Sequence, residues 1–321
     1  MQWATRMSEL AKSMPGYSSH KGFVAEDGER VTMIEFESAA TQRAWSLNAE
    51  HVEDFRRGTR DHELETSMQY LLSVFLLLFA SASLAEDQLV KVDTRPGVSV
   101  SFYYMKREGA IATVVLLPGG EGGIGMKDGA PASGNFLVRS RDYFSANGFN
   151  VAVVGQPTDR PDLDFAFRVS PEHVEDLRKV AAFLKQDSAL PVWLIGTSRG
   201  TISATAAAIA SDNAELAGMV LTSSVTNWKK RGAVPSQRLD AIRIPVLVLH
   251  HAKDACDVCR PHEVASIIAG LKNAPVKKLI MVSGGAGPSG DPCTALHWHG
   301  FIGMEKEAVD LISAWVKNPK T

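Results

Sequence analysis

The sequence predicts an α/β domain over residues 86–321, with a mostly parallel central sheet and helices on both faces of that sheet. Short apolar runs, often β-branched and bounded by Gly, Pro or Asp, are typical of strands buried on both faces. Amphipathic stretches alternate with these runs, which implies right-handed crossovers between parallel strands. The predicted strands are 112–117, 151–154, 192–195, 219–221, 246–249 and 279–282, and the predicted helices are 136–146, 171–186, 201–209, 261–271 and 305–316.

Composition and charge narrow the class of protein. The 321 residues are 45% hydrophobic and 22% charged, which is an ordinary globular composition. A net charge of -2 offers no electrostatic basis for binding nucleic acid, so we expect no nucleic-acid partner. Ahead of the first parallel strand, residues 89–93 and 98–104 are predicted to form an antiparallel hairpin.

The most apolar stretch of the chain is residues 70–85. It is shorter than the roughly 20 residues that span a bilayer as a helix, and Ser83 and Ala85 are placed as in a signal-peptidase site. We therefore expect a secretory signal, and a periplasmic or secreted protein, if translation starts near Met68. The alternative is a fusion in which an uncleaved 70–85 segment anchors the chain in a membrane. The expected parts of the chain are 1–67, 68–85 and 86–321.

The first part, residues 1–67, follows a helix–strand–strand–helix pattern. Its segments MPGYSSHKGF and VTMIEFESAATQRAWSLNAEHVEDFRRG resemble the antibiotic-biosynthesis-monooxygenase-like family of small α+β barrels. The match covers about the later two-thirds of such a domain. His20, Trp45 and His51 can be read as a haem or substrate pocket, but we favour surface histidines and a packed tryptophan. A truncated sheet with an unpaired edge is poorly suited to independent stability, so we assign this part no activity.

The segment VWLIGTSRG, followed by TISATAAAIA, carries the strongest chemical signal of the chain. An apolar strand runs directly into Gly196-Thr197-Ser198-Arg199-Gly200, and a helix of small residues follows. This is the G-x-S-x-G pattern in a strand–turn–helix context, where a serine sits on a strained turn and the flanking glycines let strand and helix pass closely. The pattern predicts that Ser198 is a nucleophile.

A nucleophilic serine requires a base and a group that orients the base. Asp254 lies a few residues beyond the predicted strand IPVLVLHH, and Asp257 lies three residues further on. His297 and His299 follow the next strand, LIMVSGG, in the run HWHGF before the last predicted helix. An imidazole with a pKa of about 6.5 suits proton transfer at neutral pH.

The glycine-rich segment 118–123, Pro-Gly-Gly-Glu-Gly-Gly, follows the first long core strand. Glycine permits backbone conformations whose N–H groups point at a developing negative charge. A phosphate-binding loop is a poorer interpretation, because the G-K-[ST] ending is missing. We expect Gly120 or Glu121, together with the N–H of Arg199, to form an oxyanion hole.

Together these segments resemble the α/β-hydrolase superfamily in content and order, over essentially all of residues 86–321. The resemblance implies acyl transfer to water through an acyl-Ser198 intermediate, no cofactor, and a small-molecule acyl substrate. It also implies Asp254 as the orienting acid and one of the two histidines as the base, of which we favour His299 over His297. The alternatives are a non-catalytic ligand-binding protein on the same fold, or a bifunctional fusion with a monooxygenase-like first domain.

All three cysteines, Cys256, Cys259 and Cys293, fall close to the predicted acid and base. In an exported protein this spacing favours a disulfide that ties the two loops together, with Cys293 bridged to Cys256 or to Cys259. A zinc site built from Cys256-x-x-Cys259-x-x-His262, with His250, His251 or Cys293, is the alternative, and a redox C-x-x-C is a third. We favour the disulfide and expect no metal.

Several charged or polar residues near the predicted site are candidates for substrate contacts, although they could equally pair with one another. Glu121, Arg139 and Arg199 would make the mouth of the site polar, which suggests a polar or anionic ester as substrate. The remaining candidates lie in the segments 135–139, 158–160 and 167–168.

Overall fold

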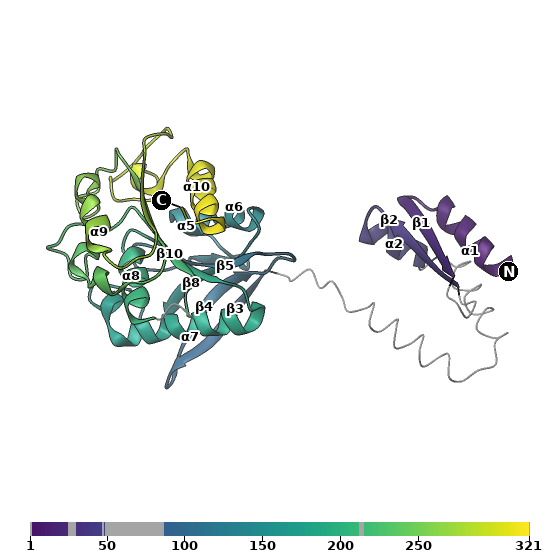
Figure 1. Ribbon diagram of the computed structural model, residues 1–321, viewed down its shortest axis with the longest axis horizontal. Helices are drawn as coiled ribbons and strands as arrows, with labels where there is room; N and C mark the ends of the chain where they lie inside the picture. The colour runs from purple at the N-terminus through teal and green to yellow at the C-terminus, as the bar shows by residue number, and fades with distance from the viewer. Residues whose placement is uncertain (1, 25–29, 47, 49–86, 212–214, 321) are drawn as a thin grey trace. The chain divides into compact units, whose positions relative to one another are not determined.

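The computed structural model describes residues 2–24, 30–46, 48, 87–211 and 215–320. The chain divides into two compact units, Met1–Ser81 and Ala82–Thr321 (Figure 1). The predicted secretory signal and His51 lie outside the described residues. In the part of the chain that is described, no helix combines the length and the apolar character needed to cross a membrane.

The first unit contains the predicted helix, two strands and helix in that order: α1 (Gln2–Ser13), β1 (Tyr17–Val24), β2 (Arg30–Phe36) and α2 (Ala39–Ser46). The two strands pair antiparallel, with Tyr17 opposite Phe36. The rings of Phe36 and Trp45 lie 5.6 Å apart, so the tryptophan packs on the sheet. The Tyr17 hydroxyl is 2.6 Å from His20 Nδ1. His20 and Trp45 thus contact their own neighbours in this small unit.

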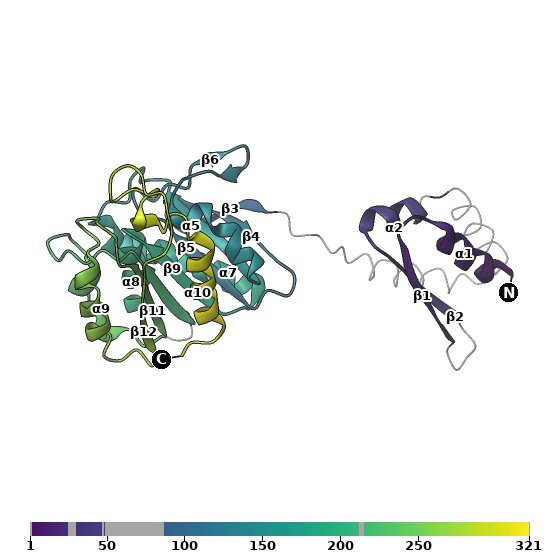
Figure 2. The same ribbon diagram turned by 90° about the horizontal axis from the view of Figure 1, so that it is seen from above.

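In the second unit, the described strands form a mixed sheet with the order β12-β11-β10-β9-β5-β8-β4-β3. All neighbouring pairs from β12 to β8 are parallel, while β8–β4 and β4–β3 are antiparallel. Every predicted strand and the predicted hairpin are therefore confirmed (Figure 2). The bounds are β3 (Gln88–Arg95), β4 (Val98–Met105), β5 (Ala112–Leu117), β8 (Phe149–Pro157), β9 (Val192–Thr197), β10 (Gly218–Thr222), β11 (Val246–His251) and β12 (Lys277–Val282), and a separate small hairpin joins β6 (Met126–Lys127) to β7 (Ala130–Pro131).

Helices cover both faces of this sheet, as predicted (Figure 1). They are α5 (Phe136–Arg139), α6 (Arg141–Ala146), α7 (Pro171–Ser188), α8 (Gly200–Ala210), α9 (Ala265–Gly270) and α10 (Glu305–Lys317). The predicted helix 136–146 is in fact two, because Ser140 leaves helical geometry with φ -98° and ψ 4°. The predicted helix 261–271 is likewise a 3-10 turn, Pro261–Glu263, followed by α9.

Alternate residues of each strand supply two separate cores. Val115 and Leu117 of β5 face the core under α7, α8 and α9, while Val114 and Leu116 face the core under α5, α6 and α10. Strands that are apolar on both faces can be buried only in such a three-layer arrangement. The carboxyl ends of β5, β9, β11 and β12 then meet at one edge of the sheet, which is where ligand sites form in folds of this type.

Candidate active site

Ser198 lies on the turn between β9 and α8 with φ 52°, a left-handed conformation that is costly for a residue with a side chain. Three hydrogen bonds hold the turn. The Ser198 N–H donates to the Thr222 carbonyl at 3.0 Å, and both the N–H and the hydroxyl of Thr201 donate to the Ser198 carbonyl at 2.9 and 2.6 Å. Strained backbone fixed in this way is characteristic of functional sites. The predicted strand–turn–helix around Ser198 is confirmed.

The glycines of the motif are required by close approach. A Cβ at Gly196 would lie 2.5 Å from the Gly200 carbonyl oxygen, and a Cβ at Gly200 would collide with the Leu117 carbonyl oxygen of the neighbouring strand β5. Both clashes involve backbone atoms, which cannot turn aside as a flexible side chain can. The two glycines therefore let α8 start directly over the sheet edge.

We expect Gly200→Ala to destabilise the second unit by about 3 kcal/mol, because an added methyl group in a filled space forces backbone movement. Urea or thermal unfolding checks this value. Gly134→Ala is the matched control, since a Cβ at Gly134 meets no atom within 4 Å and its φ is not positive. Equal unfolding midpoints for the two variants would contradict the steric explanation.

Asp254 and His299 form a buried pair at the same sheet edge. His299 Nδ1 donates to Asp254 Oδ2 at 2.9 Å, and the two residues are 5% and 4% exposed. The Ser223 hydroxyl donates to the His299 carbonyl at 2.7 Å and so holds the backbone of the histidine loop. Between the two histidines left open by the sequence, the structure brings His299 to the acid. His297 Nδ1 is buried and has no hydrogen-bond partner among the residues that the structure describes.

The carboxylate of Asp254 is held from three directions. Its Oδ1 accepts the Cys256 N–H at 2.9 Å, and its Oδ2 lies 3.4 Å from His250 Nε2 as well as accepting from His299. Burial alone would raise the pKa of Asp254, but the hydrogen bonds of His250 and His299 outweigh burial and lower the pKa to about 2. The group is therefore ionised at neutral pH. By contrast, Asp257 is exposed and pairs with Arg260.

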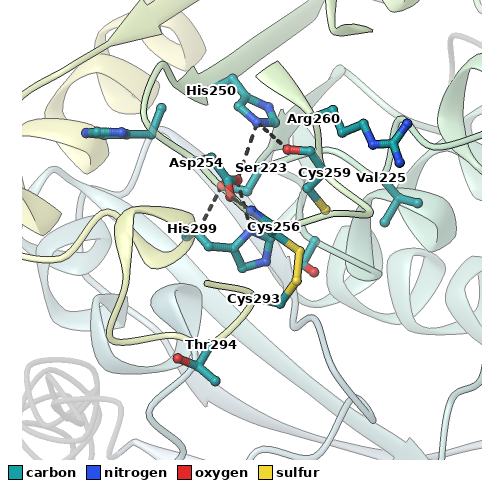
Figure 3. A network of polar contacts seen from close by, with 12 residues as sticks. Ser223, Val225, His250, Asp254, Cys256, Cys259, Arg260, Cys293, Thr294 and His299 are labelled. Atoms are coloured by element: carbon teal, nitrogen blue, oxygen red, sulfur yellow. Dashed lines mark hydrogen bonds and ion pairs between the residues drawn. A yellow bond between two sulfur atoms is a disulfide. The ribbon is translucent and has the colours of Figure 1, made fainter. Parts of the chain in front are cut away.

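Of the three cysteines, Cys256 and Cys293 are joined by a disulfide, while Cys259 is a buried free thiol (Figure 3). The disulfide ties the loop of Asp254 to the loop of His299. The Ser198 hydroxyl interacts with the Cys259 thiol, and among the described residues it makes no hydrogen bond to His299. Hydrogen bonds between nucleophile and base are often long before substrate binds.

The glycine-rich loop after β5 is pinned by its carbonyl groups. Those of Pro118 and Gly120 accept from Arg168 Nη2 at 3.1 Å each, and that of Glu121 accepts from the Leu163 N–H at 2.9 Å. In a trans peptide the carbonyl and the following N–H point in opposite directions, so these bonds turn the N–H groups of Gly119 and Glu121 away from Arg168. A Cβ at Gly119 would lie 2.7 Å from the Ser198 Cβ, which places this loop against Ser198.

Three backbone N–H groups near Ser198 remain available to donate hydrogen bonds to a ligand. Within the described residues, the backbone N–H groups of Gly120, Glu121 and Arg199 donate to no other group of the protein. These are the residues for which the sequence predicts an oxyanion hole. Arg199 follows Ser198 directly, and its side chain lies over the Phe165 ring at 4.8 Å and 3.9 Å from Asp162.

Arg168 is only 1% exposed and cannot be a substrate contact, so that candidate role is wrong. Its Nε donates to the Leu163 carbonyl and its Nη1 to the Ser203 hydroxyl, at 2.9 and 2.8 Å. Among the described residues no carboxylate pairs with it. Burial, aided by the charge of Arg199, lowers the pKa of Arg168 to about 9, so the guanidinium stays charged at neutral pH.

Several other candidate substrate contacts also serve the fold. Asn135 caps α5 by accepting the Leu137 N–H, Arg139 donates to the Gly300 carbonyl, and Asp159 pairs with Arg95. Sequence reasoning missed the roles of Arg168, Ser223 and His250, which all act from buried positions. The sequence hinted at burial only for Arg168, which lies among apolar residues next to Phe167. It did not indicate which groups the Arg168 side chain contacts.

The order of the strands in the sheet is that of the α/β-hydrolase fold. The positions of Ser198 on its strained turn, Asp254 after β11 and His299 after β12 also agree with this fold. No family model matches the chain, and no curated protein matches it in sequence.

Solved structures support this fold class. An esterase from Pyrococcus furiosus is 15% identical, with a TM-score of 0.54 over 72% of this chain and 90% of that chain. The esterase domain of a Rhodothermus marinus protein is 13% identical, with a TM-score of 0.51 over 72% and 98%. A protein from Xanthomonas campestris, described as an α/β serine hydrolase without a lid, is 14% identical with a TM-score of 0.50 over 74% and 97%. At these identities the likeness shows the fold.

Proposed function

We propose that the second unit is a serine hydrolase that cleaves an ester or a related acyl bond of a small-molecule substrate through an acyl-serine intermediate. The observation that carries the proposal is the buried hydrogen bond between Asp254 and His299 at the sheet edge that also carries Ser198. The names of the similar solved structures, two esterases and a serine hydrolase, support the same class of reaction.

In the proposed reaction, Ser198 Oγ attacks the acyl carbon while His299 Nε2 takes the hydroxyl proton. Asp254 keeps the Nδ1–H of His299 in place and stabilises the imidazolium that forms. The imidazolium then gives its proton to the leaving alkoxide. A water molecule, deprotonated by the same histidine, releases the acid and restores Ser198. Because Asp254 is ionised down to about pH 2, it can serve this role throughout the physiological range.

The negative charge of the tetrahedral intermediate needs donors that are already in place. We propose that the free N–H groups around Gly120, Glu121 and Arg199 supply them. Arg168 would then be a positioning residue, because its bonds to the carbonyls of Pro118 and Gly120 set the direction of the neighbouring N–H groups.

We expect Arg168→Met to lower kcat by about 10²-fold, with little change in KM, since loss of one oxyanion donor has an effect of that size. Arg168→Lys should recover part of the loss, because an ammonium can still reach one carbonyl. Steady-state kinetics on a p-nitrophenyl ester measures kcat and KM separately, and circular dichroism checks that the variants are folded. A rise in KM with unchanged kcat would contradict a role of Arg168 in positioning the oxyanion donors.

The proposed function is tested by a fluorophosphonate probe, which reacts covalently with activated serines. We expect stoichiometric labelling of the full chain, mapped by peptide mass spectrometry to Ser198, together with hydrolysis of short p-nitrophenyl esters. Absence of both labelling and hydrolysis, with binding of acyl ligands retained, would favour a ligand-binding protein on the same fold. Labelling at another serine would overturn the assignment of the nucleophile.

A further inference from the structure

A group of sulfur and nitrogen atoms gathers beside the proposed base. One ligand atom each from Cys256, Cys259 and His299 lies within 4.8 Å of the other two, and all three residues are buried. The sulfur of Cys293 is bonded to that of Cys256 and completes a set of four (Figure 3). Three sulfurs and one imidazole nitrogen are a common ligand set for structural zinc.

The local backbone also suits a metal. Cys256 and Cys259 have the C-x-x-C spacing of zinc ligand pairs, and the Cys259 N–H donates to the Cys256 carbonyl at 3.0 Å, which closes a tight turn. Ligand atoms around tetrahedral zinc, with bonds of about 2.3 Å to sulfur, are about 3.8 Å apart. Contraction by up to about 1 Å among the ligand atoms of Cys256, Cys259 and His299 would therefore suit the metal. The Cys293 sulfur, 2.06 Å from that of Cys256 in the disulfide, would have to move away from it once the bond is reduced.

The hydrogen bond of His299 is the one that a zinc-bound histidine needs. Its Nδ1–H donates to Asp254, which leaves Nε2 as the ring nitrogen with a lone pair for a metal. Histidines that bind zinc almost always donate their other N–H to a carboxylate or carbonyl in this manner. The pair that prepares His299 as a base in the proposed hydrolase would thus equally prepare it as a ligand.

With the disulfide formed, this site is closed to metal because two of its three sulfur atoms are bonded to each other. The bond is nevertheless open to reduction, since Cys293 is exposed while Cys256 is buried. A phosphine attacks one sulfur, takes an oxygen atom from water to become a phosphine oxide, and leaves a thiol on each cysteine. No other co-reactant is required.

We propose that reduction of Cys256–Cys293 creates a zinc site formed by Cys256, Cys259, Cys293 and His299 Nε2. The three thiols lose their protons to solvent as the metal–sulfur bonds form. Bound zinc occupies the lone pair with which His299 would accept the proton of Ser198. The site therefore acts as an inhibitory switch, because zinc can bind and block His299 only in the reduced protein. This consequence rests on the proposed function. His262, a ligand in the zinc alternative that the sequence suggests, is exposed and takes no part.

The test compares oxidised and phosphine-reduced full-length protein, desalted without oxygen and titrated with Zn²⁺ or Co²⁺ alone. The reduced protein is expected to bind one equivalent and to give the sulfur-to-metal charge-transfer and d–d bands of tetrahedral cobalt. The oxidised protein should give neither. Reduced Cys259→Ser, which keeps the other two cysteines, should bind zinc at least about 100-fold more weakly, since loss of a mere hydrogen-bond partner of a ligand already costs about 10- to 100-fold. Equal binding by reduced wild type and this variant, or by both redox states, overturns the proposal.

A second measurement, the thermal unfolding midpoint, tests the metal site even if the reduced protein is poorly folded. Zinc should raise the thermal midpoint of reduced wild type, whereas magnesium should not, because binding to the folded state alone stabilises it. No shift with zinc contradicts the site. Ester hydrolysis by the oxidised protein is measured separately and should be lost on reduction with zinc and recovered with a chelator. An oxidised protein that hydrolyses nothing would refute the proposed function, while the cobalt spectrum would still decide the metal site.

Discussion

Ser198→Ala is expected to lower kcat for short p-nitrophenyl esters by about 10⁶-fold, a loss as large as removal of the base itself would cause. The reason is chemical, since alanine has no oxygen with which to form the acyl intermediate. Alanine also keeps the Cβ that already packs on the loop of Gly119, so the fold should be retained. Single-turnover kinetics and fluorophosphonate labelling both measure the loss.

The control for this variant is Ser266→Ala. Ser266 is an exposed serine of α9 whose hydroxyl donates to the Glu263 carbonyl. The esterase activity of Ser266→Ala should equal that of wild type. Activity of Ser198→Ala within about tenfold of wild type would mean that another nucleophile acts, and the proposed mechanism would fail.

Asp254→Asn is expected to lower kcat by about 10⁴-fold, because an amide cannot stabilise the imidazolium and can present its NH₂ to His299. Asp257→Asn is the matched control, since that carboxylate is exposed and lies on the same loop. It should retain full activity. A large loss of kcat in Asp257→Asn with a small loss in Asp254→Asn would mean that Asp257, and not Asp254, orients His299.

The same pair of variants tests the acid stability of the site. The folded-state pKa of Asp254, about 2, lies below the ordinary value of 3.8, so its contribution to stability is fully present above pH 4 and is lost as the pH falls towards 2. The shift corresponds to about 2 kcal/mol. The free energy of unfolding of Asp254→Asn should therefore vary less between pH 4 and pH 2 than that of wild type, while Asp257→Asn should follow wild type.

Regular structure in the second unit was predictable because its signals are local. Strands that are apolar on both faces and helices of period 3.6 show in short windows of sequence. The start of α7 was equally clear, since Pro171 opens the helix and Ser170 caps it by accepting the His173 N–H. The break at Ser140 was missed because the apolar periodicity continues through it. Only the backbone geometry of that residue reveals two helices.

Roles in the candidate site were less predictable wherever they depend on partners far away in the chain. Arg168 reaches the carbonyls of Pro118 and Gly120 about fifty residues earlier. Ser223 holds the His299 carbonyl from seventy-six residues away. No property of a serine or an arginine in its local window distinguishes such a buried contact from an exposed side chain.

By itself the sequence determined the layered α/β architecture and the serine on its turn, because strand period, helix period and a glycine-flanked bend are set by neighbouring residues. Only the tertiary structure decided that Asp254 meets His299 rather than His297, that Cys293 joins Cys256 rather than Cys259, and that Arg168 is buried. The physical reason is that these are contacts between loops. Which of two near-equivalent side chains comes within bonding distance is fixed by how the strand ends are packed side by side.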